Sequence, residues 1–178
     1  MARTSMGTAH SGVAGNSETS SGRQHLAFTL NGEVFAIEIL QIREIIEFGA
    51  LTEVPMMPPT IRGVINLRGA VVPVIDLSAR FGRGPSVVAR RTCIVIIEVH
   101  MEETSQTLGV MVDAVNEVME IPAEDVEPTP AFGARIRTDF IAGMGRVNGR
   151  FVIILDVARV FSLDELASLG NVAAEAAM

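Results

Sequence analysis

Apolar and polar residues alternate along most of the chain in short segments that predict β-strands joined by tight turns. The clearest case is residues 61–77, where two runs rich in β-branched residues flank a turn containing Gly69 and end at Asp76. Residues 141–157 repeat this plan around Asn148-Gly149, a favoured type I′ hairpin pair. The two segments share Ile61/Ile141, Gly63/Gly143, Gly69/Gly149, Val72/Val152 and Asp76/Asp156. The chain is therefore predicted to contain two similar halves.

The other predicted strands fit the same repeat. Residues 24–37 read as a hairpin around Asn31-Gly32, and residues 92–99 form an apolar strand that returns at 107–112. Residues 36–47 match 109–120 at an offset of 73, although the apolar spacing at 39–46 leaves helix and strand both open. Two copies of a five-strand unit with few helices predict an all-β (mainly) fold of two small barrels packed side by side.

Three segments fall outside this repeat. Residues 1–23 are mostly small and polar, so a disordered tail is expected there. Residues 24–170 are predicted to form one domain of two intertwined β-barrel subdomains, with the polar link at 82–91 as the boundary between the halves in sequence. Residues 162–165 form a capping box, Ser-Leu-Asp-Glu, that predicts a short helix ahead of a frayed end at 171–178.

Charge and composition narrow the class of protein. A net charge of −7 argues against nucleic acid as a partner, because phosphate binding needs a cationic surface. Residues 24–91 hold six acids and seven arginines (+1), whereas residues 92–178 hold fourteen acids and five arginines (−9). This asymmetry either keeps the protein soluble or gives the halves different partners.

The chain shows no pattern of a membrane or secreted protein. No apolar run approaches the roughly 18 residues of a membrane span, and the N-terminus has no signal-peptide pattern. A soluble protein with no direct membrane insertion is expected. The single Cys93 lies in an apolar strand, where it is expected to act as a small buried hydrophobe, which suits the cytoplasm.

The residue sets that enzymes use are missing from the sequence. His10, His25 and His100 are not spaced with Cys, His or carboxylates as metal ligands are. There is no Gly-x-Ser-x-Gly elbow, and the absence of Lys excludes a phosphate loop ending in Gly-Lys. We therefore expect no metal, no cofactor and no catalysis.

The carboxylates favour structural roles. Asp76 and Asp156 each end a predicted strand just before a helical turn, where an Asp can cap exposed backbone N–H groups. Glu44 lies in an otherwise apolar segment, and Arg68 in the hairpin turn is its expected partner. A carboxylate-dependent enzyme that uses Glu44 and Asp76 is the alternative from another class.

Some apolar residues lie in predicted loops. Met56, Met57 and Met144 suit either an adaptable binding surface or packing, and packing is favoured. Phe132 follows Pro130 on a proline-stiffened loop and is consistent with both a protein-contact anchor and an ordinary loop residue.

Residues 52–81 closely resemble the bacterial chemotaxis coupling protein family CheW. The resemblance rests on Asn66-Leu67-Arg68-Gly69 followed by the pattern Val-x-Pro-x-x-Asp-Leu at 71–77. It extends from about residue 24 to 169 and includes 109–113, 127–130 and 139–145. It implies two SH3-like five-stranded barrels and a non-enzymatic scaffold that couples transmembrane chemoreceptors to the histidine kinase CheA. Such a protein is cytoplasmic and recruited to the membrane-associated receptor array.

The resemblance also implies two docking surfaces. A groove between the barrels, near Ile42, Glu44, Gly63 and Arg68, would bind the helical hairpin tip of the chemoreceptor. In the family, the positions of Glu44 and Arg68 look like an ion pair that shapes this surface.

A second surface would contact the kinase. Residues Glu127, Pro130 and Phe132 match a contact to the CheA regulatory domain, with Phe132 as its anchor. One member of the family has Arg at the position of Glu127, so the charge of this contact is reversed here. A CheW-like adaptor of a non-flagellar chemosensory pathway is the alternative with the same fold.

Overall fold

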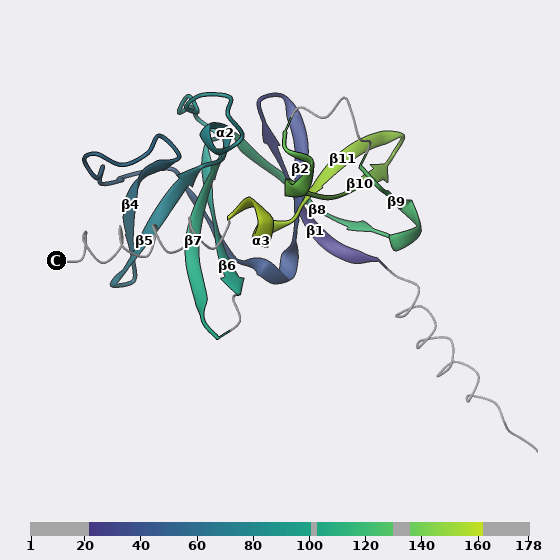
Figure 1. The fold of residues 1–178 in the computed structure, drawn as a ribbon, viewed down its shortest axis with the longest axis horizontal. Helices are drawn as coiled ribbons and strands as arrows, with labels where there is room; N and C mark the ends of the chain where they lie inside the picture. Colours follow the sequence, from purple (N-terminus) through teal and green to yellow (C-terminus); the bar gives the residue numbers. More distant parts are fainter. Residues whose placement is uncertain (1–21, 101–102, 130–135, 162–178) are drawn as a thin grey trace, which may run out of the picture.

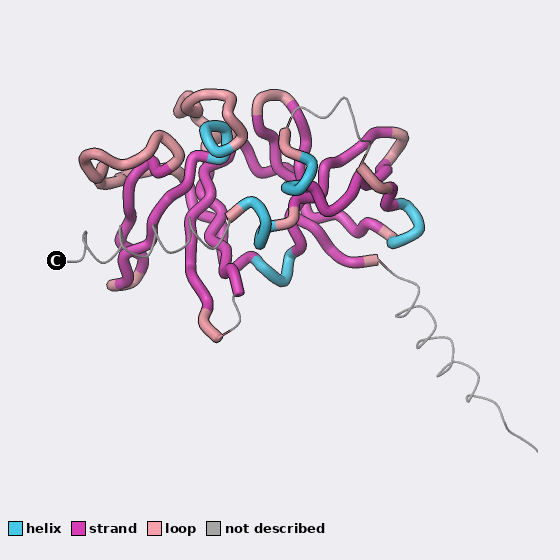
Figure 2. Tube along the Cα trace, in the orientation of Figure 1, coloured by secondary structure: helices cyan, strands magenta, loops and turns pink. Residues whose placement is uncertain are grey.

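A computed structural model of the chain describes residues 22–100, 103–129 and 136–161 (Figure 1). Its strands are β1 (Arg23–Leu30), β2 (Glu33–Glu38), β3 (Ile42–Glu47), β4 (Ile61–Leu67), β5 (Ala70–Asp76), β6 (Cys93–His100), β7 (Ser105–Val112), β8 (Ala114–Ile121), β9 (Val126–Glu127), β10 (Ile141–Val147) and β11 (Arg150–Leu155). The helical segments are the α-helices α2 (Leu77–Arg80) and α3 (Val157–Val160) and the 3₁₀ turns η1 (Ile39–Gln41), η2 (Ala123–Asp125) and η3 (Thr138–Phe140). Figure 2 shows that these are short segments between strands.

The strands form two sheets, which confirms the mainly β fold class. One sheet has the order β8-β1-β2-β11-β10-β9 and the other β3-β6-β7-β5-β4. In the sequence repeat, the strands β1, β2, β3, β4 and β5 correspond in turn to β6, β7, β8, β10 and β11. With this correspondence, and without the two-residue strand β9, the two sheets have the same strand order. Even the bulges recur, between Ile61 and Gly63 in β4 and between Ile141 and Gly143 in β10. The internal duplication is confirmed.

The polar link at residues 82–91 lies between the two repeats in the sequence, but each sheet contains strands from both repeats. The hairpin β1–β2 of the first repeat belongs to the sheet of β8, β10 and β11, and the hairpin β6–β7 of the second repeat belongs to the sheet of β3, β4 and β5. Each repeat thus lends its first hairpin to the other. Hydrophobic patterns specify strands and turns locally, whereas long-range packing chooses the partner of each strand.

Three groups of buried side chains hold the fold together. One group lies within each sheet: Ile65, Val72, Val74, Ile94, Ile96 and Met111 in the sheet of β3, and Ala36, Ile121, Val152 and Ile154 in the sheet of β1. The largest group combines residues of both sheets and includes Phe28, Phe35, Val95 and Phe140. Because the two sheets share this core and exchange hairpins, we expect them to unfold together.

A row of aromatic rings crosses the shared core. Phe28, Phe35, Phe81 and Phe140 follow one another with ring centroids 5.9, 5.5 and 5.9 Å apart, distances typical of favourable aromatic pairs. The guanidinium of Arg80 lies 4.7 Å from the Phe140 centroid, and its Nε donates to the carbonyl of Val160 at 2.7 Å. These contacts join α2 to α3, the corresponding helices of the two repeats.

Local expectations are largely confirmed. Asn31-Gly32 and Asn148-Gly149 have the paired positive φ angles (54° and 81°, 53° and 78°) of type I′ turns. The ambiguous stretch at 39–46 is the 3₁₀ turn η1 followed by β3. The strand expected from residue 24 begins at Arg23, whereas residues 1–21 and the helix expected at 162–169 lie outside the described residues.

Two expectations about apolar residues need correction. Met57 packs against the shared core as favoured, but Met56 is fully exposed on a backbone with φ 64°. Cys93 is only partly buried, and its thiol donates to the carbonyl of Arg91 at 3.3 Å. No helix within the described ranges is long and apolar enough to cross a membrane.

Candidate functional site

Glu44 and Arg68 form a bidentate ion pair, as the sequence predicts. Arg68 Nη2 donates to Glu44 Oε1 at 3.0 Å, and Arg68 Nη1 donates to Oε2 of the same carboxylate. This forked hydrogen bond lowers the pKa of the Glu44 carboxyl and raises the pKa of the Arg68 guanidinium. The pair therefore stays ionised at neutral pH and links the edge strand β3 to the turn between β4 and β5.

The backbone presents Arg68 outward. Arg68 has φ 54° and Gly69 has φ 89°, so they form a two-residue turn like Asn148-Gly149 in the second repeat. A left-handed conformation disfavours a long side chain such as Arg and suits Asn. The Arg68 side chain is 73% exposed. Since Arg68 adds backbone strain and its side chain buries little surface, the fold itself does not require an arginine here.

A groove of about 710 Å³ opens beside this ion pair. Its apolar floor includes Val72 and Ile96, and its rim carries the charges of Arg43, Glu44 and Arg68; the remaining lining residues are Leu67, Ala70, Val71, Gln106 and Thr107. Nine of the ten lie in strands β3 to β7, and Arg68 lies in the turn between β4 and β5. This groove thus lies on one sheet. An apolar floor within a charged rim suits the side of a protein segment.

Ile42 and Gly63 do not line this groove. Ile42 is half-buried and packs against the shared core. A bulge places Ile42 opposite Ile97 and Glu44 opposite Ile96, so Arg43 is the extra residue and its side chain lies 3.4 Å from Glu98. The bulge sets the direction of Glu44, which is a common use of a β-bulge beside a functional site.

Gly63 lies beneath the segment at residues 51–55. A Cβ atom at Gly63 would lie 2.4 Å from the carbonyl oxygen of Thr52 and 2.5 Å from a methyl carbon of Leu51. The absence of this atom lets Thr52 pair with Val64 through two backbone hydrogen bonds of 2.9 and 2.8 Å. Gly63 is therefore a positioning residue for the segment 51–55.

Gly63→Ala is expected to destabilise the protein by about 1–3 kcal/mol, because the new methyl group must push the Thr52 backbone away. Hydrogen exchange should then speed up at the amides of Thr52 and Val64, measured against unchanged exchange in the corresponding strand β10. A fully stable Gly63→Ala variant with slow exchange at both amides would contradict this role.

The structure describes only Glu127 of the three predicted kinase-contact residues. Pro130 and Phe132 lie outside the described residues. Glu127 pairs with β10 in the sheet, and its carboxylate lies 2.7 Å from Nη2 of Arg146. Arg146 also lies over the half-exposed ring of Phe151, 5.3 Å from the centroid. The negative charge of Glu127 is thus balanced within the protein.

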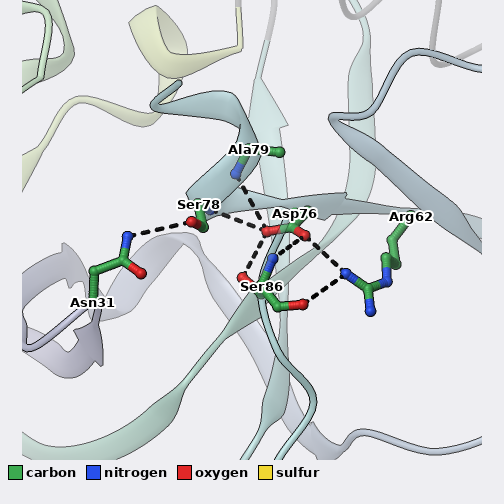
Figure 3. A network of polar contacts seen from close by, with 6 residues as sticks. All are labelled: Asn31, Arg62, Asp76, Ser78, Ala79 and Ser86. Atoms are coloured by element: carbon green, nitrogen blue, oxygen red, sulfur yellow. Dashed lines mark hydrogen bonds and ion pairs between the residues drawn. The ribbon is translucent and has the colours of Figure 1, made fainter. Parts of the chain in front are cut away.

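Asp76 is the centre of a buried polar network (Figure 3). Its carboxylate is fully buried and caps α2 by accepting from the backbone N–H groups of Ser78 and Ala79. It also accepts from Ser86 N at 2.8 Å, Ser86 Oγ at 2.7 Å and Arg62 Nη1 at 3.0 Å. The cap role predicted for Asp76 is confirmed, and the site is a closed structural cluster.

Sequence reasoning did not identify the partners of Asp76. Asp156 caps α3 with a single hydrogen bond of 3.3 Å from Arg159 N, as predicted, but it is 37% exposed. A difference between the repeats could have pointed to these partners, because Arg62 corresponds to Ala142 in the second repeat.

Glu44 and Asp76 do not share a site, because Asp76 is buried and does not line the groove beside Glu44. Among the described residues, no three His, Cys, Asp or Glu side chains are grouped to hold a metal ion.

The fold and the groove define a β-rich docking module, and comparison with known proteins identifies its family. The model of the CheW-like domain matches residues 24–165, so the chain belongs to the CheW-like family. It is 32% identical to the chemotaxis protein CheW of Klebsiella aerogenes (85% of this chain, 89% of that protein) and 33% identical to that of Rhizobium meliloti (83% and 92%). The scaffolding protein TtCheW from Thermoanaerobacter tengcongensis superimposes with a TM-score of 0.71 at 32% identity, covering 81% of this chain and 90% of that one. These relationships give the chain the role of a chemotaxis coupling scaffold.

Proposed function

We propose that this scaffold joins transmembrane chemoreceptors to the regulatory domain of the histidine kinase CheA, and that it is recruited from the cytoplasm to the receptor array. The groove beside Glu44 and Arg68 receives the helical hairpin tip of the receptor, while Ile42 and Gly63 hold the surrounding strands. The loop that carries Glu127, Pro130 and Phe132 contacts the kinase. Control of the kinase then follows from simultaneous docking, without catalysis by the scaffold.

The main support for this proposal is the position of Arg68. Arg68 occupies a strained turn position where the second repeat has Asn148, and it is held outward by a forked hydrogen bond to Glu44. A side chain that the fold does not require, placed on the rim of a groove, is best explained by a partner that contacts it. The charged rim gives orientation, and the apolar floor gives contact area.

The direct test is binding of both partners at once. The full chain is titrated with a purified receptor signalling fragment, with the purified CheA regulatory domain, and with each in the presence of a saturating amount of the other. We expect a complex with each partner and no competition between them. Competition for one surface, or failure to bind either partner, would refute the adaptor mechanism.

A further inference from the structure

A pocket of about 440 Å³ lies where β1 begins, in the sheet that does not carry the receptor groove. Its apolar lining includes Ile121, Ala142 and Ile154. Gly22, which leads into β1, also lines it. A Cβ atom at Gly22 would lie 2.1 Å from the carbonyl oxygen of Ile121, so the backbone is packed tightly against the pocket wall here. The segment that precedes β1 in the sequence therefore starts at this pocket.

The strand pairing shows which segment of the second repeat corresponds to the one before β1. Four pairs fix the alignment: His25 with Glu38 and with Met119 in one sheet, and Ile94 with Met111 and with Ile46 in the other. Since Met111 follows Glu38, and Met119 follows Ile46, at the repeat offset of 73, His25 corresponds to Ile94, at an offset of 69. At this offset Gly15-Asn16-Ser17 corresponds to Gly84-Pro85-Ser86.

The segment before β6 covers the end of β5 in the sheet of β3 (Figure 3). Ser86 donates to the carboxylate of Asp76 twice, from its backbone N at 2.8 Å and from its hydroxyl at 2.7 Å. The carbonyl of Ser86 accepts from Arg62 at 3.0 Å. Under this cover Asp76 is completely buried, and Ser86 is buried with it. A short segment that leads into a first strand thus closes this end of the sheet.

The same end of the sheet of β1 is open among the described residues. Asp156 ends β11 where Asp76 ends β5, but it accepts one hydrogen bond, 3.3 Å long, from Arg159 N, and its side chain is 37% exposed. An ionised carboxylate has about four acceptor positions, so Asp156 can accept more hydrogen bonds. Ala142 stands at the position of Arg62, and it lines the pocket. This sheet therefore has both a free acceptor and a space at the place that Ser86 and Arg62 occupy in the other.

The chain before β1 is long enough to supply the missing contact. Six positions lead from Ser86 to Thr92, and six lead from Ser17 to Arg23, the residue equivalent to Thr92. Because Ser86 reaches Asp76 over this span, Ser17 can reach Asp156 over the same span. The link at 82–91 is fixed at both ends, whereas the segment before β1 is fixed at one end only. Its docking therefore costs more conformational entropy and should be weaker.

We propose that residues 15–21 fold back over this pocket, and that Ser17 donates to the carboxylate of Asp156 as Ser86 does to that of Asp76. The pocket is then a docking site for a segment of the same chain. The disordered tail expected from the sequence is reduced to about residues 1–14. The docked segment lies on the sheet of β1, so the receptor groove on the other sheet stays free. The inference depends on neither of the two proposed partners.

The test measures amide hydrogen exchange in the full chain. We expect the amide of Ser17 to exchange roughly threefold slower than in a free peptide of residues 10–21, because a weakly docked segment lies at the low end of local stabilities. Ser17→Glu places a second carboxylate beside Asp156, and the protection at this position should disappear. Ser20→Glu is the matched control, since Ser20 corresponds to the exposed Ala89. This variant should keep the wild-type protection. Ser17→Thr retains both donors and should keep it as well.

Several results would overturn the proposal. These are free exchange at Ser17 in the wild type, unchanged protection in Ser17→Glu, or an equal loss in Ser20→Glu. Protection that rises with protein concentration would place the segment on a second copy of the chain and would also refute it. The apolar dye anilinonaphthalene sulfonate should bind more strongly to Ser17→Glu than to the wild type. Equal dye binding by the two would mean that the wild-type pocket is open, against the proposal.

Discussion

Arg68→Glu is expected to abolish binding to the receptor fragment while the protein stays folded. The substitution replaces the forked Arg68–Glu44 hydrogen bond with two neighbouring carboxylates on the rim of the groove. Both side chains are on the surface, so water screens their repulsion and the melting temperature should stay close to that of the wild type. Receptor binding by calorimetry and kinase activation in reconstituted arrays measure the loss.

Arg68→Asn provides the matched control for the backbone. Asn occupies the equivalent turn position in the second repeat, at Asn148 with φ 53°, so it should relieve strain and melt no lower than the wild type. It removes the charge all the same, and receptor binding should still be lost. Full receptor binding by Arg68→Asn, or unfolding of Arg68→Glu, would show that Arg68 is not the contact we propose.

Asp76→Asn is expected to destabilise the protein by about 3 kcal/mol, because it removes the charge of a fully buried carboxylate that satisfies several donors and pairs with the partly buried Arg62. The new amide keeps one acceptor oxygen, but its NH2 group replaces the other and cannot accept, so it faces the donors of Ser86 and Arg62 that the two carboxylate oxygens now satisfy. Chemical denaturation gives the change in free energy of unfolding. Because the two sheets share one core, the loss should appear as a single transition at lower denaturant.

The second repeat contains the control for this substitution. Asp156→Asn changes the same position in a partly exposed cap with one backbone hydrogen bond. Asn is as good as Asp at a helix N-cap, so the expected change is below about 0.5 kcal/mol. Equal destabilisation by the two substitutions would mean that the Arg62 and Ser86 contacts contribute nothing to the fold.

Several features of the site follow from local sequence. The turn at Arg68-Gly69, the caps at Asp76 and Asp156, and the partnership of Glu44 with Arg68 are all confirmed. The first two depend on residues adjacent in the chain. The third was inferred from an isolated carboxylate in an apolar segment, because such a carboxylate would need a partner if it were buried.

Other features of the site could not be predicted from local sequence. Gly63 matched a repeated glycine, yet its role depends on Thr52, which approaches it from a separate loop. Ser86 and Arg62 flank Asp76 in sequence by ten and fourteen residues, and only the fold brings their donors to one carboxylate. The exposure of Met56 likewise depends on how its loop is anchored by Met57 and Val54.

The sequence by itself determined the strands, the turns, the duplication and the family, because each of these is written in local patterns of apolar residues, glycines and short motifs. Tertiary structure decided which strands pair, because the two hairpins are exchanged between repeats by contacts far apart in the chain. It also decided that Glu44 and Arg68 meet at the rim of a groove on the sheet of β3 to β7. The burial of side chains and the pairing of these strands depend on contacts between segments that are distant in the sequence, so local patterns do not specify them.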